Sequence, residues 1–121
     1  MTDTEQMEQV EKTIEISIEA AKGAVQRKNA VERLIRHKDF VEVFTKGYME
    51  SEPARLVSLL ADAEWQSEER QSELIKDMRA ISSFRQYILG IKSMGRQMEQ
   101  QIAGSEAQLD EMRNEATEEG E

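Results

Sequence analysis

Few residues of this chain belong to the types that catalyse reactions or bind metals. The 121 residues include one histidine, His37, and no cysteine. A transition-metal site would therefore need carboxylates for nearly all of its ligands, and the Glu-x-x-His pairs of di-iron helical bundles are absent from the sequence. His37 lies between Arg36 and Lys38 near the expected end of a helix, where a histidine commonly serves as a surface cap. Serines are plentiful but have no partner base, so we expect no catalytic residue, no metal, no cofactor and no enzyme activity.

A glycine pair in the second half of the chain has the spacing of a phosphate-binding loop. Gly90 and Gly95 are the two glycines concerned. In that motif a lysine and then a serine or threonine follow the second glycine, whereas here Arg96 and Gln97 follow it, and no strand precedes the pair. We therefore expect no nucleotide site at these glycines.

The acidic charge of the chain is concentrated at its two ends. The formal net charge is −9. Residues 1–20 hold six acids against Lys12, and residues 106–121 hold seven against Arg113, whereas residues 27–46 hold six basic residues against three acids. This layout suits either a solvated surface that keeps an elongated protein dissolved, or an acidic surface that mimics nucleic acid or binds a basic protein. Direct binding of nucleic acid is not expected, because it requires a concentrated basic face.

No stretch of the sequence has the features of a membrane segment or a secretion signal. The acidic start, Met1 to Glu5, lacks the basic residues and apolar core of a signal peptide. No apolar run approaches the ~18 residues of a membrane span. We expect a protein that is made and used inside a cell and has no membrane partner.

An apolar stripe with a seven-residue repeat, here called the seam, runs through a helix predicted over residues 67–116. Ten of its thirteen positions are apolar. Such a repeat predicts a coiled-coil-like helix, which at about 1.5 Å per residue would be roughly 75 Å long. Gly95 lies on the seam, where a missing side chain would let a partner helix approach closely. The seam positions are Leu74, Asp77, Ile81, Phe84, Ile88, Ile91, Gly95, Met98, Ile102, Ser105, Leu109, Met112 and Ala116.

A second apolar stripe with the same spacing lies in a helix predicted over residues 4–37. Two long stripes, one at each end of the chain, predict two antiparallel coiled-coil-like helices. The alternative is that each helix pairs with its copy in another subunit. The positions of this stripe are Met7, Val10, Ile14, Ser17, Ala21, Ala24, Lys28, Val31 and Ile35.

Between the long helices, the sequence predicts a compact knob of two short helices, residues 39–46 and 52–62. Asp39 can cap the first of them. Gly47 can end it in the left-handed conformation that glycine tolerates. Pro53 suits the first turn of the second short helix, where its missing N–H costs nothing.

Four of the six aromatic residues lie in or beside the knob, namely Phe40, Phe44, Tyr48 and Trp65. Tyr48, Met49 and Trp65 flank predicted loops, where aromatic and apolar side chains often anchor interfaces. We therefore expect these three residues either to form a surface for a partner or to close the small core of the knob.

The composition predicts an all-α protein. The chain is 34% charged and 5% aromatic and has one proline, and the residues that favour strands are scarce. The expected fold has two long antiparallel coiled-coil-like helices, 4–37 and 67–116, joined by the knob. Residues 117–121 are acidic and poor in apolar side chains, so we expect this tail to fray.

A run of residues in the middle of the chain has a family-like pattern. It consists of Lys38-Asp39-Phe40, Val43-Phe44, Gly47-Tyr48-Met49, Glu52, Ala54-Arg55-Leu56-Val57, Leu59-Leu60-Ala61-Asp62, Gln66-Ser67-Glu68-Glu69 and Arg85-Gln86-Tyr87. With this run, residues 28–90 resemble a small helical protein of tailed bacteriophages. The resemblance implies a phage-encoded virion or assembly component that resides in the host cytoplasm or in the virion, and it supplies no catalytic residue.

These features lead to two hypotheses of function. In the first, a non-enzymatic phage structural or assembly protein forms a homo-oligomer through the seam, because one chain cannot easily cover so long a stripe, and the knob binds another phage or host protein. Leaving seam residues such as Ile88 and Ile91 in water would cost about 1.5–3 kcal/mol each. In the second, the first helix covers the seam within one chain, and the protein is an acidic phage-encoded inhibitor or adaptor that binds a host protein.

Overall fold

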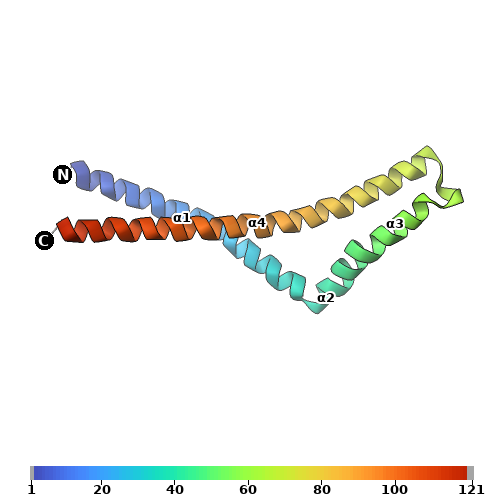
Figure 1. Ribbon diagram of the computed structural model, residues 1–121, viewed down its shortest axis with the longest axis horizontal. Coiled ribbons are helices and arrows are strands. Elements are labelled where there is room, and N and C mark those ends of the chain that lie inside the picture. The colour runs from blue at the N-terminus through green and yellow to red at the C-terminus, as the bar shows by residue number, and fades with distance from the viewer. Residues whose placement is uncertain (1, 120–121) are drawn as a thin grey trace. The chain divides into compact units, whose positions relative to one another are not determined.

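Helices make up nearly all of the described chain. The computed structural model describes residues 2–119, and the side chains of residues 3–118. No strand occurs among these residues, so the all-α prediction is confirmed. The elements are α1 (Thr2–Arg36), α2 (Lys38–Phe40), the π-helix η1 (Val41–Ser51), α3 (Glu52–Leu60), the 3-10 helix η2 (Ala63–Trp65) and α4 (Glu68–Glu119), as Figure 1 shows. The chain divides into unit 1, residues 1–29 and 91–121, and unit 2, residues 30–90.

Unit 1 is an antiparallel pair of helices, formed by the first part of α1 and the last part of α4 (Figure 1). The Arg113 guanidinium donates a hydrogen bond to the Glu15 carboxylate at 3.2 Å. Further along α1, Lys28 forms an ion pair with Glu99. A later residue of α1 thus pairs with an earlier residue of α4, so the two helices run in opposite directions in unit 1. This confirms the predicted antiparallel pairing.

The seam is the side of α4 that packs within the chain. Among the seam positions, Asp77 and Ala116 are exposed, and all the others are buried or half-buried. Leu74, Ile81 and Leu109 are 2%, 5% and 5% exposed. A seven-residue repeat keeps one side of a helix turned toward its neighbour over many turns, so the pattern located the packed face correctly.

The stripe on α1 is covered in the same way. Val10 is its one exposed position, at 44%. Ala21 is 4% exposed, and Ile18, beside the stripe, is 7% exposed. The two stripes therefore form the packed face of unit 1, and the stripe of α1 continues into unit 2 with Val31 and Ile35 half-buried.

The last helix extends beyond the predicted limit. We expected residues 117–121 to fray, but α4 continues to Glu119, so this prediction is wrong for residues 117–119. The Thr117 hydroxyl donates a hydrogen bond to the carbonyl oxygen of Arg113 at 2.9 Å, one turn earlier in the helix. Residues 120 and 121 lie outside the described residues.

Gly95 allows α1 and α4 to approach closely in unit 1. A Cβ added at Gly95 would lie 2.8 Å from both Cγ and Cδ of Lys28, which is closer than real Cβ contacts come. Gly104 shows the contrast, since a Cβ added there meets nothing within 4 Å. Close approach therefore explains the glycine on the seam.

Unit 2 contains a continuous helical rod where the sequence predicted two short helices. Residues 38–60 pass from α2 through η1 into α3 without a break. Gly47 lies inside η1, and no described glycine has a positive φ, so the prediction that Gly47 ends a helix over 39–46 is wrong. The backbone turns continue because the N–H of Glu52 bonds to the carbonyl of Gly47, five residues earlier, as in a π-helix.

Two caps also differ from the sequence predictions. The N-cap of α2 is His37 instead of Asp39, and its Nδ1 accepts a hydrogen bond from the Asp39 N–H at 3.1 Å. The helix predicted to end at residue 62 ends at Leu60. It ends there because Asp62 takes an extended conformation and caps η2, accepting a hydrogen bond from the Glu64 N–H at 2.9 Å.

The core of unit 2 is formed between α3 and the first part of α4. Leu56, Leu74 and Ile81 form the buried cluster, and Tyr48, Leu59, Leu60, Trp65 and Met78 pack against it. Burial of a leucine side chain contributes about 1.5–3 kcal/mol, so this cluster is expected to hold α3 against α4. The rod is further joined to α4 by aromatic rings, with the centroids of Phe44 and Phe84 5.7 Å apart.

Candidate binding surface

The residues with catalytic or ligand-binding chemistry are dispersed. His37 serves as a helix cap. Residues 90–97, which have the glycine spacing of a phosphate loop, are part of the helix α4. Among the described residues, no three His, Cys, Asp or Glu side chains come close enough together to hold a metal ion.

The shifted pKa values belong to ion pairs on exposed helix surfaces. The hydrogen bond from Arg55 lowers the pKa of Glu52, and the same hydrogen bond raises the pKa of Arg55. The hydrogen bond to Glu19 raises the pKa of Lys22. Each pair is three residues apart on one helix, which is the spacing of ordinary surface pairs. These shifts therefore do not mark a catalytic centre.

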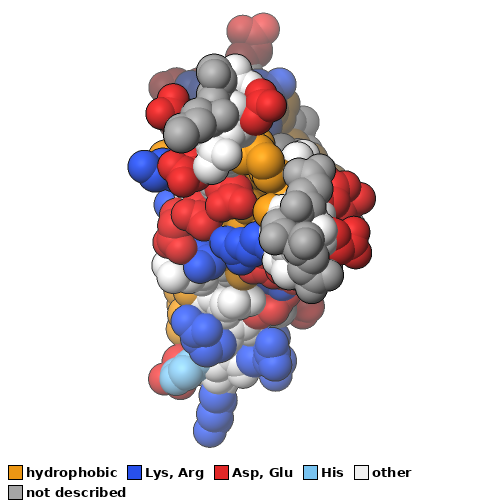
Figure 2. All heavy atoms as spheres, turned by 90° about the vertical axis from the view of Figure 1, so that its left-hand side faces the viewer, with side chains coloured by type: hydrophobic (Ala, Val, Ile, Leu, Met, Phe, Trp, Pro, Cys, Tyr) orange, Lys and Arg blue, Asp and Glu red, His pale blue; other side chains and the backbone are white. Residues whose placement is uncertain are grey.

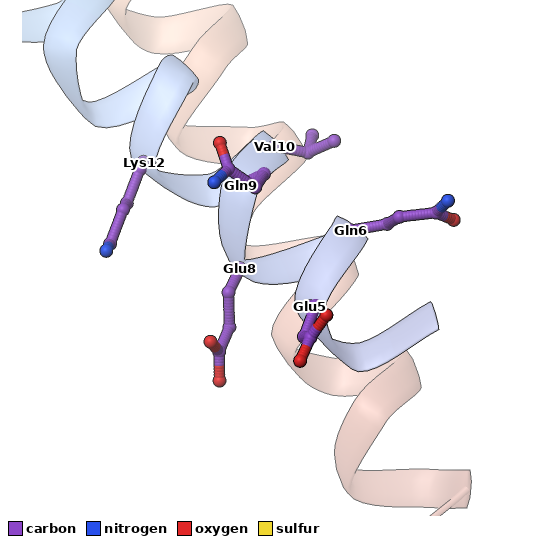
Figure 3. A pocket seen from close by; sticks show the side chains of 6 residues that line it. All are labelled: Glu5, Gln6, Glu8, Gln9, Val10 and Lys12. Atoms are coloured by element: carbon purple, nitrogen blue, oxygen red, sulfur yellow. The ribbon is translucent and has the colours of Figure 1, made fainter. Parts of the chain in front are cut away.

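A hollow of about 700 Å³ lies along the start of α1. The described residues that line it are Glu5, Gln6, Glu8, Gln9, Val10 and Lys12. Figure 3 shows that these side chains spread around the helix in different directions instead of converging on one point. A ligand site needs a few polar groups that converge, so this hollow does not have the features of one.

The three residues expected to form a partner surface have different surroundings. The ring of Tyr48 packs edge-on against Phe84, with centroids 5.7 Å apart, and belongs to the core of unit 2. Trp65 also packs against that core. Met49 lines two open surface hollows. Of the two alternatives expected for these residues, packing against the core therefore applies to Tyr48 and Trp65.

A groove lies between η1 and α4 in unit 2, and we call it the Met49–Arg85 groove. It consists of two adjoining hollows of about 250 Å³ each, which share Met49 and Arg85. One hollow is lined by Ile35, Thr45, Met49, Arg85, Ile88 and Leu89, and the other by Met49, Pro53, Met78, Ile81, Ser82 and Arg85. The groove therefore combines apolar side chains from α1, η1, α3 and α4.

Arg85 lies where the two hollows meet. Its guanidinium donates a hydrogen bond to the carbonyl oxygen of Met49 at 3.1 Å, which joins α4 to η1. Arg85 is exposed, and it is the one charged residue among those described as lining the groove. A guanidinium has five N–H donors, so this arginine retains donors for a ligand. Arg85, Leu89 and Ile35 were not predicted to form a partner surface: Ile35 was expected on the apolar stripe of the first helix, and Arg85 was part of the run that carries the resemblance.

Exposed apolar side chains are concentrated in unit 2. Single exposed apolar residues are normal, but Leu89 is 53% exposed at one end of the groove. The described large apolar side chains that are exposed in unit 2 are Leu34, Val43, Phe44, Val57, Ile75, Tyr87 and Leu89, against Val10, Ile16 and Met94 in unit 1. Unit 2 is therefore the better candidate for contact with a partner.

The free end of unit 1 is acidic. The antiparallel arrangement brings the acidic first part of α1 beside the acidic last part of α4, and red acidic side chains cluster over this end in Figure 2. Its described cations include Arg113, which bonds to Glu15, and Lys12. The two acidic segments seen in the sequence thus form one acidic surface.

The residues expected to form an oligomer seam are covered within the chain. Among them, Ile81, Gly95 and Leu109 are buried. The others are half-buried, namely Phe84, Ile88, Ile91, Met98 and Ile102. Unit 1 and unit 2 each cover much of the part of the seam that they contain, and self-association through the seam stays a prediction.

In the part of the chain that is described, no helix combines the length and the apolar character needed to cross a membrane. Comparison with known proteins adds no relative. No family model, no curated protein and no solved structure matches this chain.

Proposed function

We propose that this protein is a non-enzymatic adaptor or assembly component of a tailed bacteriophage, and that it acts by binding another phage or host protein through unit 2. The phage origin is supported by the resemblance noted in the sequence, whose residues 28–90 nearly coincide with unit 2, residues 30–90. A role in binding is supported by the open groove and the exposed apolar side chains of the same unit, which are features of interaction surfaces.

The observation that carries this proposal is that other helices of the same chain pack against the seam. A helix that already packs against its own chain does not need a second copy to hide its apolar stripe. Cover of the seam within one chain is a premise of the second hypothesis, a monomeric adaptor or inhibitor, although in unit 2 that cover comes from η1 and α3 instead of the first helix. The Met49–Arg85 groove then offers apolar surface that remains open for a different protein.

Self-association through the seam is the second candidate function. It is favoured by Ile88, Ile91, Met98 and Ile102, which are half-buried and retain some apolar surface. In unit 1 this surface lies on a pair of helices, and two such pairs from two chains could pack as a four-helix bundle.

The two candidates predict different masses in solution. We expect sedimentation equilibrium of the purified protein to give the mass of one chain over the whole concentration range. The comparison variant is Ile102→Asp, whose helicity is checked by circular dichroism. A stable wild-type dimer that Ile102→Asp dissociates, with the helicity retained, would overturn the monomeric proposal and support self-association through the seam.

A further inference from the structure

We propose that the Met49–Arg85 groove binds an amphipathic helix of a partner protein, and that this helix carries one carboxylate between its apolar residues. The inference rests on the proposed function, and it names the partner that the groove would accept. It follows from the length of the groove, the composition of its walls and the position of its one cation.

The length of the groove fits a short helical segment. Along α4, the lining residues run from Met78 to Leu89. The eleven residue-to-residue steps between them, at about 1.5 Å each, span roughly 16 Å, which is about three helical turns. Partner helices that bind in grooves commonly use apolar anchors at positions i, i+3 or i+4, and i+7, over about two to three turns.

The walls of the groove place apolar surface on both sides of a polar centre. On one side of Arg85 lie Ile35, Ile88 and Leu89, and on the other lie Pro53, Met78 and Ile81. Met49 contributes to both hollows, and the flexible thioether of methionine adapts to different apolar partners. An apolar residue before the centre of a helix and another after it could therefore each occupy one hollow.

The positive charge of Arg85, at the centre of the groove, favours an acidic residue at the middle of the partner helix. Arg85 is exposed, and it uses one hydrogen bond on the Met49 carbonyl. A guanidinium fork pairs with a carboxylate through two parallel hydrogen bonds. A lysine or arginine of the partner at the same place would instead meet a like charge, which disfavours the wrong partner.

A second copy of this chain is a poorer occupant than a different protein. The acidic helical segments of this chain are the first part of α1 and the last part of α4, and among their described residues the exposed large apolar ones are Val10 and Ile16. These two residues lie six positions apart, and residues on one face of a helix are three, four or seven positions apart. The acidic segments therefore lack the apolar row that the groove would accept.

The test is a selection with the full-length protein as the target and a displayed library of alanine-based helical peptides of about 18 residues, roughly five turns. The library varies one face of the helix with apolar, acidic and basic residues. We expect selected peptides to carry Asp or Glu between two apolar anchors. Selection against Arg85→Glu should instead enrich Lys or Arg at the same place in the peptide.

Matched variants assign the binding to the groove. The affinity of the best selected peptide should fall by about tenfold or more for Arg85→Glu, which brings two like charges together, and it should also fall for Leu89→Asp. Arg79→Glu makes the same charge change on the same helix outside the groove and should leave the affinity unchanged. Leu89→Asp changes an exposed residue, so it keeps the test valid even if Arg85→Glu loses helicity by circular dichroism.

The outcomes separate this inference from the proposed function. Selected peptides that have no charge preference, or that bind Arg85→Glu and Leu89→Asp as well as the wild type, would overturn the groove as their site while leaving a protein-binding function in place. A library that yields no binder would count against both. A wild-type oligomer that Arg85→Glu dissociates would show a second copy in the groove and would overturn the choice of a different protein.

Discussion

Replacing Gly95 with alanine tests how closely α1 and α4 approach in unit 1. The new Cβ would lie 2.8 Å from Cγ and Cδ of Lys28 and would also overlap the Lys28 Cβ. Since that Cβ is attached directly to the α1 backbone, a rotamer change of the lysine cannot remove the whole overlap. The helices must separate locally, and overpacking of this kind costs about 1–3 kcal/mol.

The matched control is Gly104→Ala on the same helix. A Cβ added there meets nothing within 4 Å, so helix propensity alone acts, and we expect the free energy of unfolding to rise by about 1 kcal/mol. At Gly95 the same gain is offset by the overlap, so the free energy of unfolding should fall by about 0–2 kcal/mol. The two alanine variants should therefore differ by about 1–3 kcal/mol.

A double-mutant cycle with Lys28 identifies the atoms that overlap. Lys28→Ala keeps the Cβ, whereas Lys28→Gly removes it, and both variants lose the ion pair with Glu99. The effect of each Lys28 variant on the free energy of unfolding is measured twice, once with native Gly95 and once with Gly95→Ala. The difference between the two measurements should show that Lys28→Gly relieves more of the destabilisation by Gly95→Ala than Lys28→Ala does. Coupling between neighbouring residues is commonly about 0.5–3 kcal/mol.

The assay is urea-induced unfolding followed by far-ultraviolet circular dichroism. The slope of each transition is compared among the variants, because a changed slope would indicate that the two units no longer unfold together. If Gly95→Ala stabilised the protein as much as Gly104→Ala, the close approach of the helices at Gly95 would be refuted.

Three further predictions follow from unit 2. Leu56→Ala should lower the free energy of unfolding by about 2–5 kcal/mol, whereas exposed Leu89→Ala should have a small effect, and equal losses in urea unfolding would contradict the location of the core. Gly47→Ala should change the free energy of unfolding by less than about 1 kcal/mol, because Gly47 has no positive φ and the gain in helix propensity is opposed by a tight contact of the new Cβ with the Glu42 carbonyl oxygen, at 3.3 Å; a loss of several kcal/mol would contradict the continuous helix at Gly47. The hydrogen bond from Arg55 lowers the pKa of Glu52, so this pKa, followed by NMR, should rise in Arg55→Gln. The ion pair should stabilise the wild type fully above the ordinary pKa of a glutamate, and this contribution should be lost as the pH falls through the lowered pKa of Glu52.

The long helices were predictable because their packing leaves a regular trace in the sequence. A seven-residue repeat needs no knowledge of the partner helix, and the seam from Leu74 to Met112 became the packed face, with exposed Asp77 as the exception. The two stripes together also predicted the antiparallel pair. The repeat alone did not decide whether the helices that pack against the seam belong to the same chain or to another subunit.

The absence of a helix break at Gly47 was not predictable from local sequence, because glycine permits a left-handed turn without requiring one. Rings on both sides of it hold the rod against α4, with Phe44 and Tyr48 each packed on Phe84 at centroid distances of 5.7 Å. These contacts join residues about forty positions apart, and local propensity does not include them. The cap at His37 instead of Asp39 is a smaller error, within the usual uncertainty of helix ends.

The candidate site was predictable only in part. Met49 was singled out because it is an apolar residue that, with Tyr48, flanks a predicted loop. Arg85 lies 36 positions later, in a helix that contains other arginines, and nothing in its local sequence indicates that it contacts Met49. Only the packing of η1 beside α4 brings Arg85 to Met49, so the groove required the three-dimensional structure.

The separation of contacts along the chain has a consequence for the order of folding. In unit 1, Glu15 bonds to Arg113, 98 positions away, whereas the bond between Arg85 and Met49 in unit 2 spans 36 positions. Short loops close at lower entropic cost and generally fold faster. We therefore expect unit 2 to form before unit 1 when the unfolded chain is allowed to refold. In an intermediate with only unit 2 formed, the first part of α1 has no helix to cover its stripe, so this intermediate is the species most exposed to wrong pairing or to chaperones.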